Sequence, residues 1–242
     1  GFDYIRFENL DVRNARDAVE VSTGSSNIVI DGLKSDGNHF AVKINSATNV
    51  TVRNVIAKNS RNAFRTENTG GIVPTNILFE NIEAYDSKDI YSGYESKYRN
   101  GDGFILEAGN NITVRNVISA NNWDAGFDVK ATNVTFENVV TYGNKNGFKI
   151  WGKGTVVKNA LVYGQKRMVN DPVAGEGNGV NARTGSVTFI NSTFVDNEAF
   201  DVKVDNQGGA SNVTFQNSII ARSLSGGQMF TNVGGVFTEK NN

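Results

Sequence analysis

Three aspartates and one lysine recur beside Gly-Phe pairs in the middle of the chain. Asp102 lies in the segment Gly-Asp-Gly-Phe, Asp124 and Asp128 flank the segment Ala-Gly-Phe, and Lys149 follows Asn-Gly-Phe. If the three Gly-Phe pairs are structurally equivalent, these four polar side chains lie on one patch. Carboxylates that lie close together repel one another unless a positive charge lies between them. A hard cation with oxygen ligands resolves that repulsion, and Ca²⁺ suits flexible carboxylate sites.

The inventory of metal-ligating residues favours calcium over zinc. The chain has a single His, His39, and no Cys, whereas zinc sites are built mainly from these two residue types. Any one of these aspartates taken alone is more simply interpreted as a charged residue on a solvated outer face than as a metal ligand. For the stacked set of Asp102, Asp124 and Asp128, we favour a metal site.

A repeat that runs through the whole chain must position these residues. An alternating apolar motif that ends in Asn returns throughout the sequence, for example at 114–117 and 136–139. The Asn of one copy lies 22 residues before the Asn of the next, as in Asn116 and Asn138, and longer spacings mark insertions. The nine positions are Asn9, Asp31, Asn54, Asn81, Asn116, Asn138, Asn159, Asn191 and Asn217.

Each repeat is expected to contain three short strands. In the sixth copy these are 134–136, 139–142 and 147–151, separated by Asn and Gly turns. No 3.6-residue apolar period is present, so helices are not expected. The pattern predicts an all-β parallel β-helix of about nine coils, one domain over residues 1–242, with an internal Asn ladder. Leucine-rich repeats and propellers would need a Leu framework or a period of about 40 residues.

Aligning the third strands on Gly-Phe predicts two columns of side chains. The first column, expected to face solvent by strand alternation, is Glu20, Lys43, Arg65, Ile105, Asp128, Lys149, Asn181 and Asp201. The second is Asp17, Phe40, Asn62, Asp102, Ala125, Asn146, Asn178 and Glu198. Coils four, five and six therefore bring Asp102, Asp128 and Lys149 of these columns, and Asp124 next to Ala125, onto one patch.

Two insertions flank this patch along the chain. Residues 86–101 and 165–177 lengthen the fourth and seventh coils, and long loops in a compact repeat are usually functional or disordered. We expect them to wall an open cleft suited to a chain-like ligand. Stacking on sugar rings, or a plain packing role, is expected of the aromatic residues Tyr91, Tyr94, Tyr98, Trp123 and Trp151.

The same segments resemble those of family 9 polysaccharide lyases, the calcium-dependent pectate lyases built on a right-handed β-helix. That family carries Gly-Asp-Gly-aromatic, then Asp-Asp-Gly-x-Asp one coil later, then Asn-Gly-aromatic-Lys. The resemblance implies a right-handed β-helix in which Asp102, Asp124 and Asp128 bind Ca²⁺ and Lys149 is the Brønsted base. Ala125 stands where the family has the second Asp of its pair, which puts calcium binding, substrate choice or activity in doubt.

The activity implied by this resemblance is β-elimination in a uronate-containing polysaccharide such as pectate. Lys43, Arg65 and Trp151 are candidates for binding that substrate, with solvated-face charges as the alternative for the two cations. A glycoside hydrolase that uses Asp102 and Asp128 as its carboxylate pair is a rival interpretation. A non-catalytic carbohydrate-binding or structural β-helix is another, and Ala125 favours it.

Composition excludes other classes of partner. The net charge is −1, with no basic patch typical of nucleic-acid binding, and no apolar run approaches the ~18 residues of a membrane span. We therefore expect an acidic polysaccharide as partner and neither nucleic acid nor membrane. We also expect a secreted monomer whose signal peptide is not in this chain. Because the sequence opens directly in a strand-like segment, we expect a processed or excised piece of a longer protein.

Overall fold

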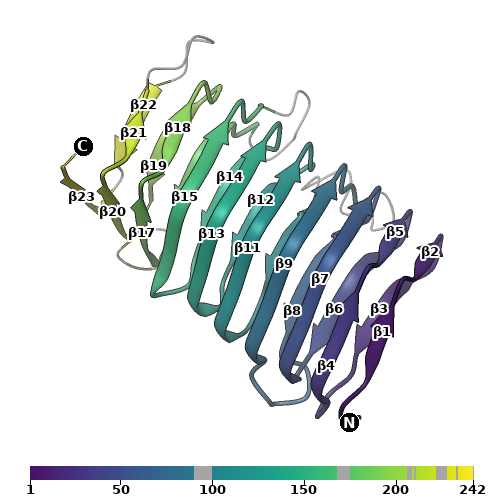
Figure 1. Cartoon of the computed structure of the whole chain (residues 1–242). Coiled ribbons are helices and arrows are strands. Elements are labelled where there is room, and N and C mark those ends of the chain that lie inside the picture. The colour runs from purple at the N-terminus through teal and green to yellow at the C-terminus, as the bar shows by residue number, and fades with distance from the viewer. Residues whose placement is uncertain are drawn as a thin grey trace.

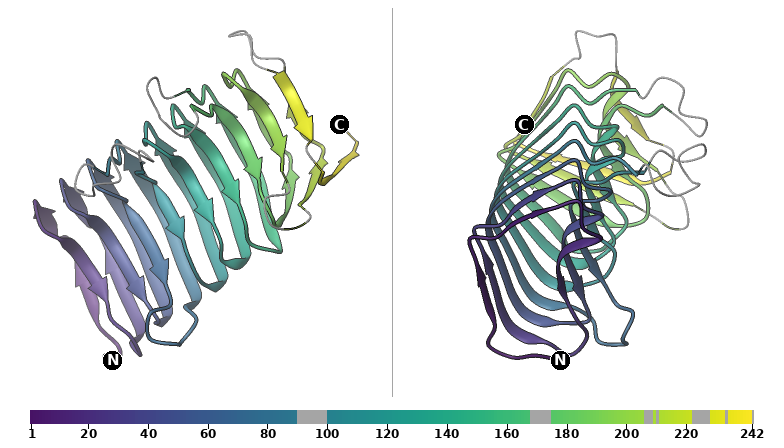
Figure 2. Two further views of the ribbon diagram at one scale, coloured as in Figure 1. Left: turned by 180° about the vertical axis from the view of Figure 1, so that it is seen from behind. Right: turned by 90° about the vertical axis from the view of Figure 1, so that its right-hand side faces the viewer.

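The computed structural model of the chain describes residues 1–89, 100–167, 175–205, 209, 211–221, 228–232 and 234–241. These residues wind into a right-handed parallel β-solenoid of about nine turns (Figure 1). Seen from its end, the solenoid shows the coils stacked in register (Figure 2). The described residues contain no helix, and so none that could cross a membrane. The predicted fold class is confirmed.

The strands form two parallel sheets that share one interior. The 14-stranded sheet holds the first and second strands of each coil: β1 (Arg6–Glu8), β2 (Asp11–Arg13), β4 (Ser26–Asp31), β5 (Lys34–Asp36), β7 (Thr48–Lys58), β9 (Thr75–Tyr85), β11 (Asn110–Ala120), β13 (Thr132–Tyr142), β15 (Thr155–Tyr163), β17 (Ser186–Ile190), β18 (Thr193–Val195), β20 (Asn212–Gln216), β21 (Ile219–Ile220) and β23 (Val236–Lys240). The nine-stranded sheet holds the third strands: β3 (Asp17–Val21), β6 (Phe40–Asn45), β8 (Phe64–Glu67), β10 (Phe104–Leu106), β12 (Ala125–Val129), β14 (Asn146–Ile150), β16 (Asn178–Ala182), β19 (Phe200–Val204) and β22 (Gln228–Asn232).

A row of phenylalanines fills the core behind the third strands. Phe64, Phe104, Phe127 and Phe148 are fully buried and follow one another along the solenoid, with ring centroids 4.6, 5.3 and 4.9 Å apart. Burial of such rings supplies most of the apolar free energy of a coil. The Phe of each Gly-Phe pair therefore anchors its strand against the core. The residue that follows the Phe points away from the core.

The recurrent Asn positions form a ladder on the outside of the solenoid, so the prediction that they lie inside is wrong. Asn116 accepts a hydrogen bond from Asn138 and donates one to Asn81, each over 3.1 Å, and all three are exposed. Their φ angles are 54–55°, a left-handed conformation that Asn tolerates better than most residues. That conformation bends the chain between the first and second strands and turns the side chain outward.

A different ladder of amides lies inside. Asn122 donates to Asn144 over 2.8 Å and Asn144 donates to Gln165 over 3.1 Å, and all three side chains are fully buried. The same side chains also hold turn backbone, because Asn144 Oδ1 accepts the Asn122 N–H and Gln165 Oε1 accepts the Asn144 N–H. These hydrogen bonds pair the buried polar groups at the second bend of each coil, between its second and third strands.

The predicted columns hold through seven coils and fail at the eighth. Lys149 pairs with Asn181, and Asn181 pairs with Lys203 rather than with Asp201. Likewise Phe200, not Glu198, continues the second column after Asn178, because Val180 pairs with Val202. A shift of two residues keeps the same alternation of faces, so alternation in the sequence did not decide the register of the eighth coil.

Asp201 occupies a buried place as a result of that register. It precedes Val202 and so lies opposite Gly179, fully buried, with Oδ2 lacking a hydrogen-bond partner among the described residues. Burial raises the pKa of Asp201 to about 6. Folding therefore makes this carboxyl retain its proton to a higher pH than in the unfolded chain.

Removing one rung of the inner ladder should destabilise the fold more than changing the outer one. Asn144→Leu leaves several buried donors and acceptors unpaired, which should cost at least about 3 kcal/mol of unfolding free energy. Asn138→Gly, the matched control, keeps the left-handed turn and should cost less than about 1 kcal/mol. Urea unfolding measures both. Equal losses would contradict the assignment of the inner ladder.

The buried carboxyl of Asp201 predicts a pH-dependent stability. Since its folded pKa is raised, its contribution is fully present below about pH 4 and is lost as the pH rises through about 6. Asp201→Asn should therefore gain about 1–2 kcal/mol over the wild type between pH 4 and pH 7.5, allowing for solvent screening. Urea titrations across this range test it, and parallel pH profiles of the two proteins would refute it.

Candidate active site

The third strands of three successive coils carry the cluster. Ile105 of β10 pairs with Asp128 of β12, and Asp128 pairs with Lys149 of β14. A pocket of about 260 Å³ lies over these strands. Its lining residues are Arg61, Asn62, Arg65, Asp89, Asn100, Asp102, Ile105, Asp124, Asp128, Lys130, Lys149 and Trp151.

Glycine is required beside each of the three Phe residues because the turn of the next coil comes close. A Cβ added at Gly103 would lie 2.0 Å from Ser119 Oγ, and one added at Gly126 would lie 2.2 Å from Thr141 Oγ1. Contacts that short do not occur between real atoms. The Gly-Phe pairs thus allow close packing of the bend, and this packing brings Asp102 and Asp124 next to β14.

The amine of Lys149 lies between two carboxylates. Its Nζ is 2.9 Å from Oδ2 of Asp124 and 3.5 Å from Oδ2 of Asp128. The third carboxylate, that of Asp102, accepts the backbone N–H of Ala125 over 2.9 Å. The structure therefore places the three aspartates and the lysine at one spot, as the columns require.

The cluster is more enclosed than alternation alone suggests. Asp102, Asp124 and Asp128 are 3%, 7% and 4% exposed, and Asn181 of the same outward column is fully buried. The prediction that this column faces solvent is wrong at Asp128 and Asn181. Their side chains point away from the core, but the side chains of adjacent coils cover them and keep them from water.

Burial and mutual charge set the protonation of the cluster. Burial, with the nearby charge of Asp124, raises the pKa of Asp102 well above its usual range. Burial also acts to raise the pKa of Asp124, but the opposing effect of the Lys149 and Lys145 ammonium groups is larger. The pKa of Asp124 is therefore below its ordinary value. In this arrangement Asp102 favours the neutral form and Asp124 the charged form.

The same charges hold Lys149 protonated. Burial acts to lower its pKa, but the carboxylates of Asp124, Asp128 and Asp102 raise it well above the ordinary lysine value. Abstraction of a proton by this amine therefore requires that the negative charge around it be neutralised first.

A second lysine that sequence reasoning missed adjoins the cluster. Lys130 Nζ lies 3.6 Å from Asp128 Oδ2 and 2.6 Å from Glu107 Oε2. Burial acts to lower the pKa of Lys130, but Asp128 and Glu107 raise it. Its position two residues after Asp128 on an alternating strand was a usable signal, because it puts both side chains on one face.

The next rung supplies a group of partners that the sequence did not reveal. Glu176 accepts hydrogen bonds from Asn178 and Asn181 and pairs with Arg183 over 2.8 Å. The Arg183 guanidinium lies over the Trp151 ring, 5.1 Å from its centroid. Trp151 is thereby held at the edge of the pocket.

The three predicted substrate-binding residues have different surroundings. Arg65 and Trp151 line the pocket, whereas Lys43 is not among its lining residues. Lys43 pairs with Glu67 at 2.8 Å and with Glu20 at 3.3 Å, and Arg65 pairs with Glu67 at 2.7 Å. Both cations are thus already neutralised within the chain.

The predicted walls of the cleft cannot be placed. Tyr91, Tyr94 and Tyr98 lie outside the described residues, as does most of the second insertion. Trp123 is described and is half-buried. Of the first insertion, the described residues Asp89 and Asn100 line the pocket.

The carboxylates around the pocket are of the type that binds a hard cation, but their arrangement in this structure is not that of a set of metal ligands. Four carboxylates border one pocket, those of Asp89, Asp102, Asp124 and Asp128, and the buried Oδ1 of Asp128 has no hydrogen-bond partner in the described part of the chain. Ala125 contributes no oxygen ligand. Over the same residues no three acidic, His or Cys side chains are gathered closely enough to hold a metal, and the Lys149 ammonium supplies the positive charge.

Comparison of the sequence with protein families gives one match. Residues 2–170 match the model described as "Right handed beta helix region". The chain belongs to this right-handed beta helix family. A search of curated proteins finds no match.

Solved structures of other β-helix proteins share the fold at low sequence identity. Pectate lyase Pel9A is 16% identical, with 91% of this chain and 62% of that chain covered and a TM-score of 0.60. The A-module of mannuronan C-5 epimerase AlgE6 from Azotobacter vinelandii is 18% identical, with 98% and 68% covered and a TM-score of 0.64. A GH87 α-1,3-glucanase catalytic domain is 11% identical, with 98% and 48% covered and a TM-score of 0.62. The chain thus spans less than two thirds of the lyase and about half of the glucanase domain.

Removing the lysine should expose the repulsion between the aspartates. Lys149→Met leaves buried carboxylates without their counter-charge, which should cost about 3–5 kcal/mol at pH 8. The loss should shrink at pH 5, where the aspartates can take up protons. Urea unfolding at both pH values measures this, with Lys158→Met, at an exposed ion pair with Glu137, as control. A pH-independent loss equal to that of the control would contradict the proposed electrostatics.

Proposed function

We propose that this protein is a secreted polysaccharide lyase that cleaves a uronate-containing polysaccharide, with pectate as the model substrate, by β-elimination. The observation that carries the proposal is the enclosed Lys149 amine beside Asp124 and Asp128, at the edge of a pocket that Trp151 also lines. The match of motifs with family 9 polysaccharide lyases supports it. So do the names of two similar structures, a pectate lyase and a mannuronan C-5 epimerase.

In this proposal Lys149 acts as the base. Its neutral amine takes the proton at C5 of a uronate, the electrons of that C–H bond form the C4–C5 double bond, and the C4–O bond to the neighbouring sugar breaks. The departing oxygen then takes a proton from water. Before the cofactor binds, Asp124 accepts a hydrogen bond from the Lys149 ammonium over 2.9 Å, and Arg65 and Trp151 border the space for the adjoining sugars.

Calcium is the proposed cofactor, with Asp102, Asp124 and Asp128 as its ligands. Bound calcium would supply positive charge that acidifies the C5 proton of the substrate and lowers the pKa of the neighbouring amine. Asp124 must then release the lysine ammonium. Because the carboxylates otherwise keep Lys149 protonated, activity should depend on calcium and rise into alkaline conditions.

A glycoside hydrolase is the second candidate, and one observation favours it. Burial and charge separate the pKa values of two neighbouring carboxyls, raising that of Asp102 and lowering that of Asp124. Such separation is what an acid and a base in glycoside hydrolysis require. The hydrolase considered from the sequence paired Asp102 with Asp128, whereas this second candidate takes Asp124 as the base because its pKa is lowered.

The test of the proposed lyase is the absorbance at 235 nm of the unsaturated product. Wild-type protein should produce it from polygalacturonate or alginate with calcium present and should stop when the calcium is chelated. Lys149→Ala should lose at least about 100-fold in kcat, as expected for removal of a general base. Lys158→Ala should retain full activity. Because loss of the lysine charge also lowers stability, Lys149→Arg, which keeps the charge, serves as a folded comparison.

Two outcomes would overturn this function. New reducing ends without absorbance at 235 nm would establish the hydrolase instead. Calcium-independent binding of these polymers with no turnover at any pH would leave a non-catalytic carbohydrate-binding β-helix.

A further inference from the structure

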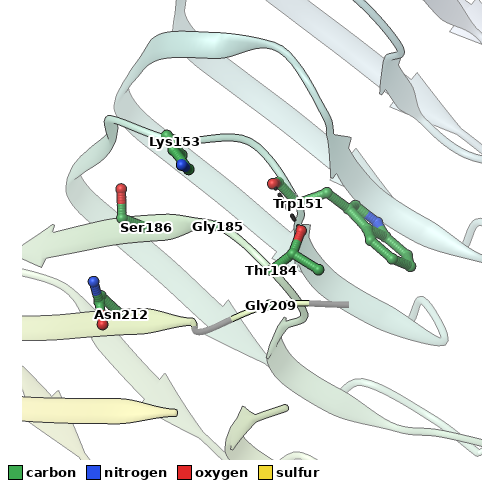
Figure 3. Close-up of a pocket in the computed structure, with 7 residues that line it drawn as sticks. All are labelled: Trp151, Lys153, Thr184, Gly185, Ser186, Gly209 and Asn212. Carbon is green, nitrogen blue, oxygen red and sulfur yellow. Dashed lines mark hydrogen bonds between the residues drawn. The ribbon is translucent and has the colours of Figure 1, made fainter. Parts of the chain in front are cut away.

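A cavity of about 580 Å³ lies beside the site, where three coils turn from their third strand into the next first strand (Figure 3). The turn after β14 contributes Trp151 and Lys153, the turn after β16 contributes Thr184, and Ser186 begins β17. Asn212, at the start of β20, completes the polar lining. Nothing in the proposed reaction uses this cavity.

Its lining offers neutral hydrogen-bonding groups held in place by backbone. Thr184 Oγ1 donates to the Trp151 carbonyl over 3.0 Å, and Ser186 Oγ accepts the Gly154 N–H over 2.9 Å. The Asn212 amide is exposed beside them. Hydroxyls and an amide of this kind match the hydroxyl groups of a sugar, because each can donate and accept hydrogen bonds.

One uncompensated positive charge adjoins these groups. Lys153 is exposed and forms no ion pair with any residue that the structure describes. The lysines nearer the aspartates, by contrast, are neutralised: Lys130 by Glu107 and Lys149 by Asp124. A hydroxyl-rich ligand that carries one carboxylate therefore fits the cavity better than a neutral one.

Trp151 joins this cavity to the pocket of Lys149, since it lines both. Its indole points away from Lys153, Ser186 and Asn212 (Figure 3) and is covered by Arg183, which Glu176 holds. A single polymer that passes over Trp151 can therefore occupy both places.

We infer that this cavity is a second sugar subsite, which binds a uronate of the same acidic chain beyond the sugars at Lys149 and pairs its carboxylate with Lys153. This inference rests on the proposed function for the identity of the polymer. It adds a prediction about chain length: oligomers too short to pass Trp151 gain nothing from Lys153, whereas longer ones do.

The experiment compares trigalacturonate with decagalacturonate on wild type, Lys153→Ala and Lys153→Glu. Lys153→Ala should raise KM for the decamer about 3- to 5-fold, the size expected of one exposed charge pair, and Lys153→Glu should raise it more. Neither change should alter kcat, or KM for the trimer. Lys158→Ala removes one lysine from β15, in the same coil, and should behave as wild type.

Calorimetry with the decamer separates failure of the subsite from failure of the lyase. Elimination by the wild type, with no difference between Lys153→Ala and Lys158→Ala on the decamer, would overturn the subsite alone. An equal rise in KM for the trimer would also overturn it, by assigning Lys153 to the first site. Binding of the decamer that depends on Lys153, without turnover, would support the subsite and refute the lyase.

Discussion

Parallel register is the constraint on which this structure depends. Each coil lies directly over the last, about 4.8 Å away, so every side chain must be compatible with its equivalents above and below. Stacked phenyl rings satisfy this rule at Phe104, Phe127 and Phe148. Amide ladders satisfy it at both bends, because each amide can donate to one neighbour and accept from the other.

Charged side chains are the hardest to place at equivalent positions of successive coils. Asp128 and Lys149 are register partners, so the sheet itself creates an opposite-charge pair at this point. Asp102 and Asp124 come from the turns that lead into the strands, and they add negative charge that one lysine does not cancel. The consequence is a set of protonation states that differ among adjacent carboxyls. Perturbed pKa values of this kind are frequent at catalytic sites, although structural ion pairs also produce them.

The scaffold does not select the chemistry. Similar coils are found in a pectate lyase, a mannuronan C-5 epimerase and an α-1,3-glucanase, so the reaction must reside in the side chains that a few rungs present. In the function proposed for this chain, those are the charged residues of β12 and β14 and of the turns before them. Ala125 is a clear local departure from the resembling lyases, and its backbone N–H binds Asp102. Because that donor is a backbone group, it does not depend on the side chain at position 125, and the Ala125 methyl group adds no oxygen ligand.

The fold followed from the sequence because the repeat is local. A 22-residue period, three apolar stretches and a Gly-Phe pair specify a coil, and stacking of coils brings Asp102, Asp124, Asp128 and Lys149 together. Three further features depended on the tertiary structure. Asn116 and Asn144 are the same residue type, but the bend at which each occurs puts one outside and the other in the core. Register in the eighth coil moved by two residues, since alternation alone cannot distinguish such a shift. Burial of Asp128 and the cavity that Trp151, Thr184 and Asn212 line were decided by neighbouring coils, because the side chains that enclose a site come from residues far apart in sequence.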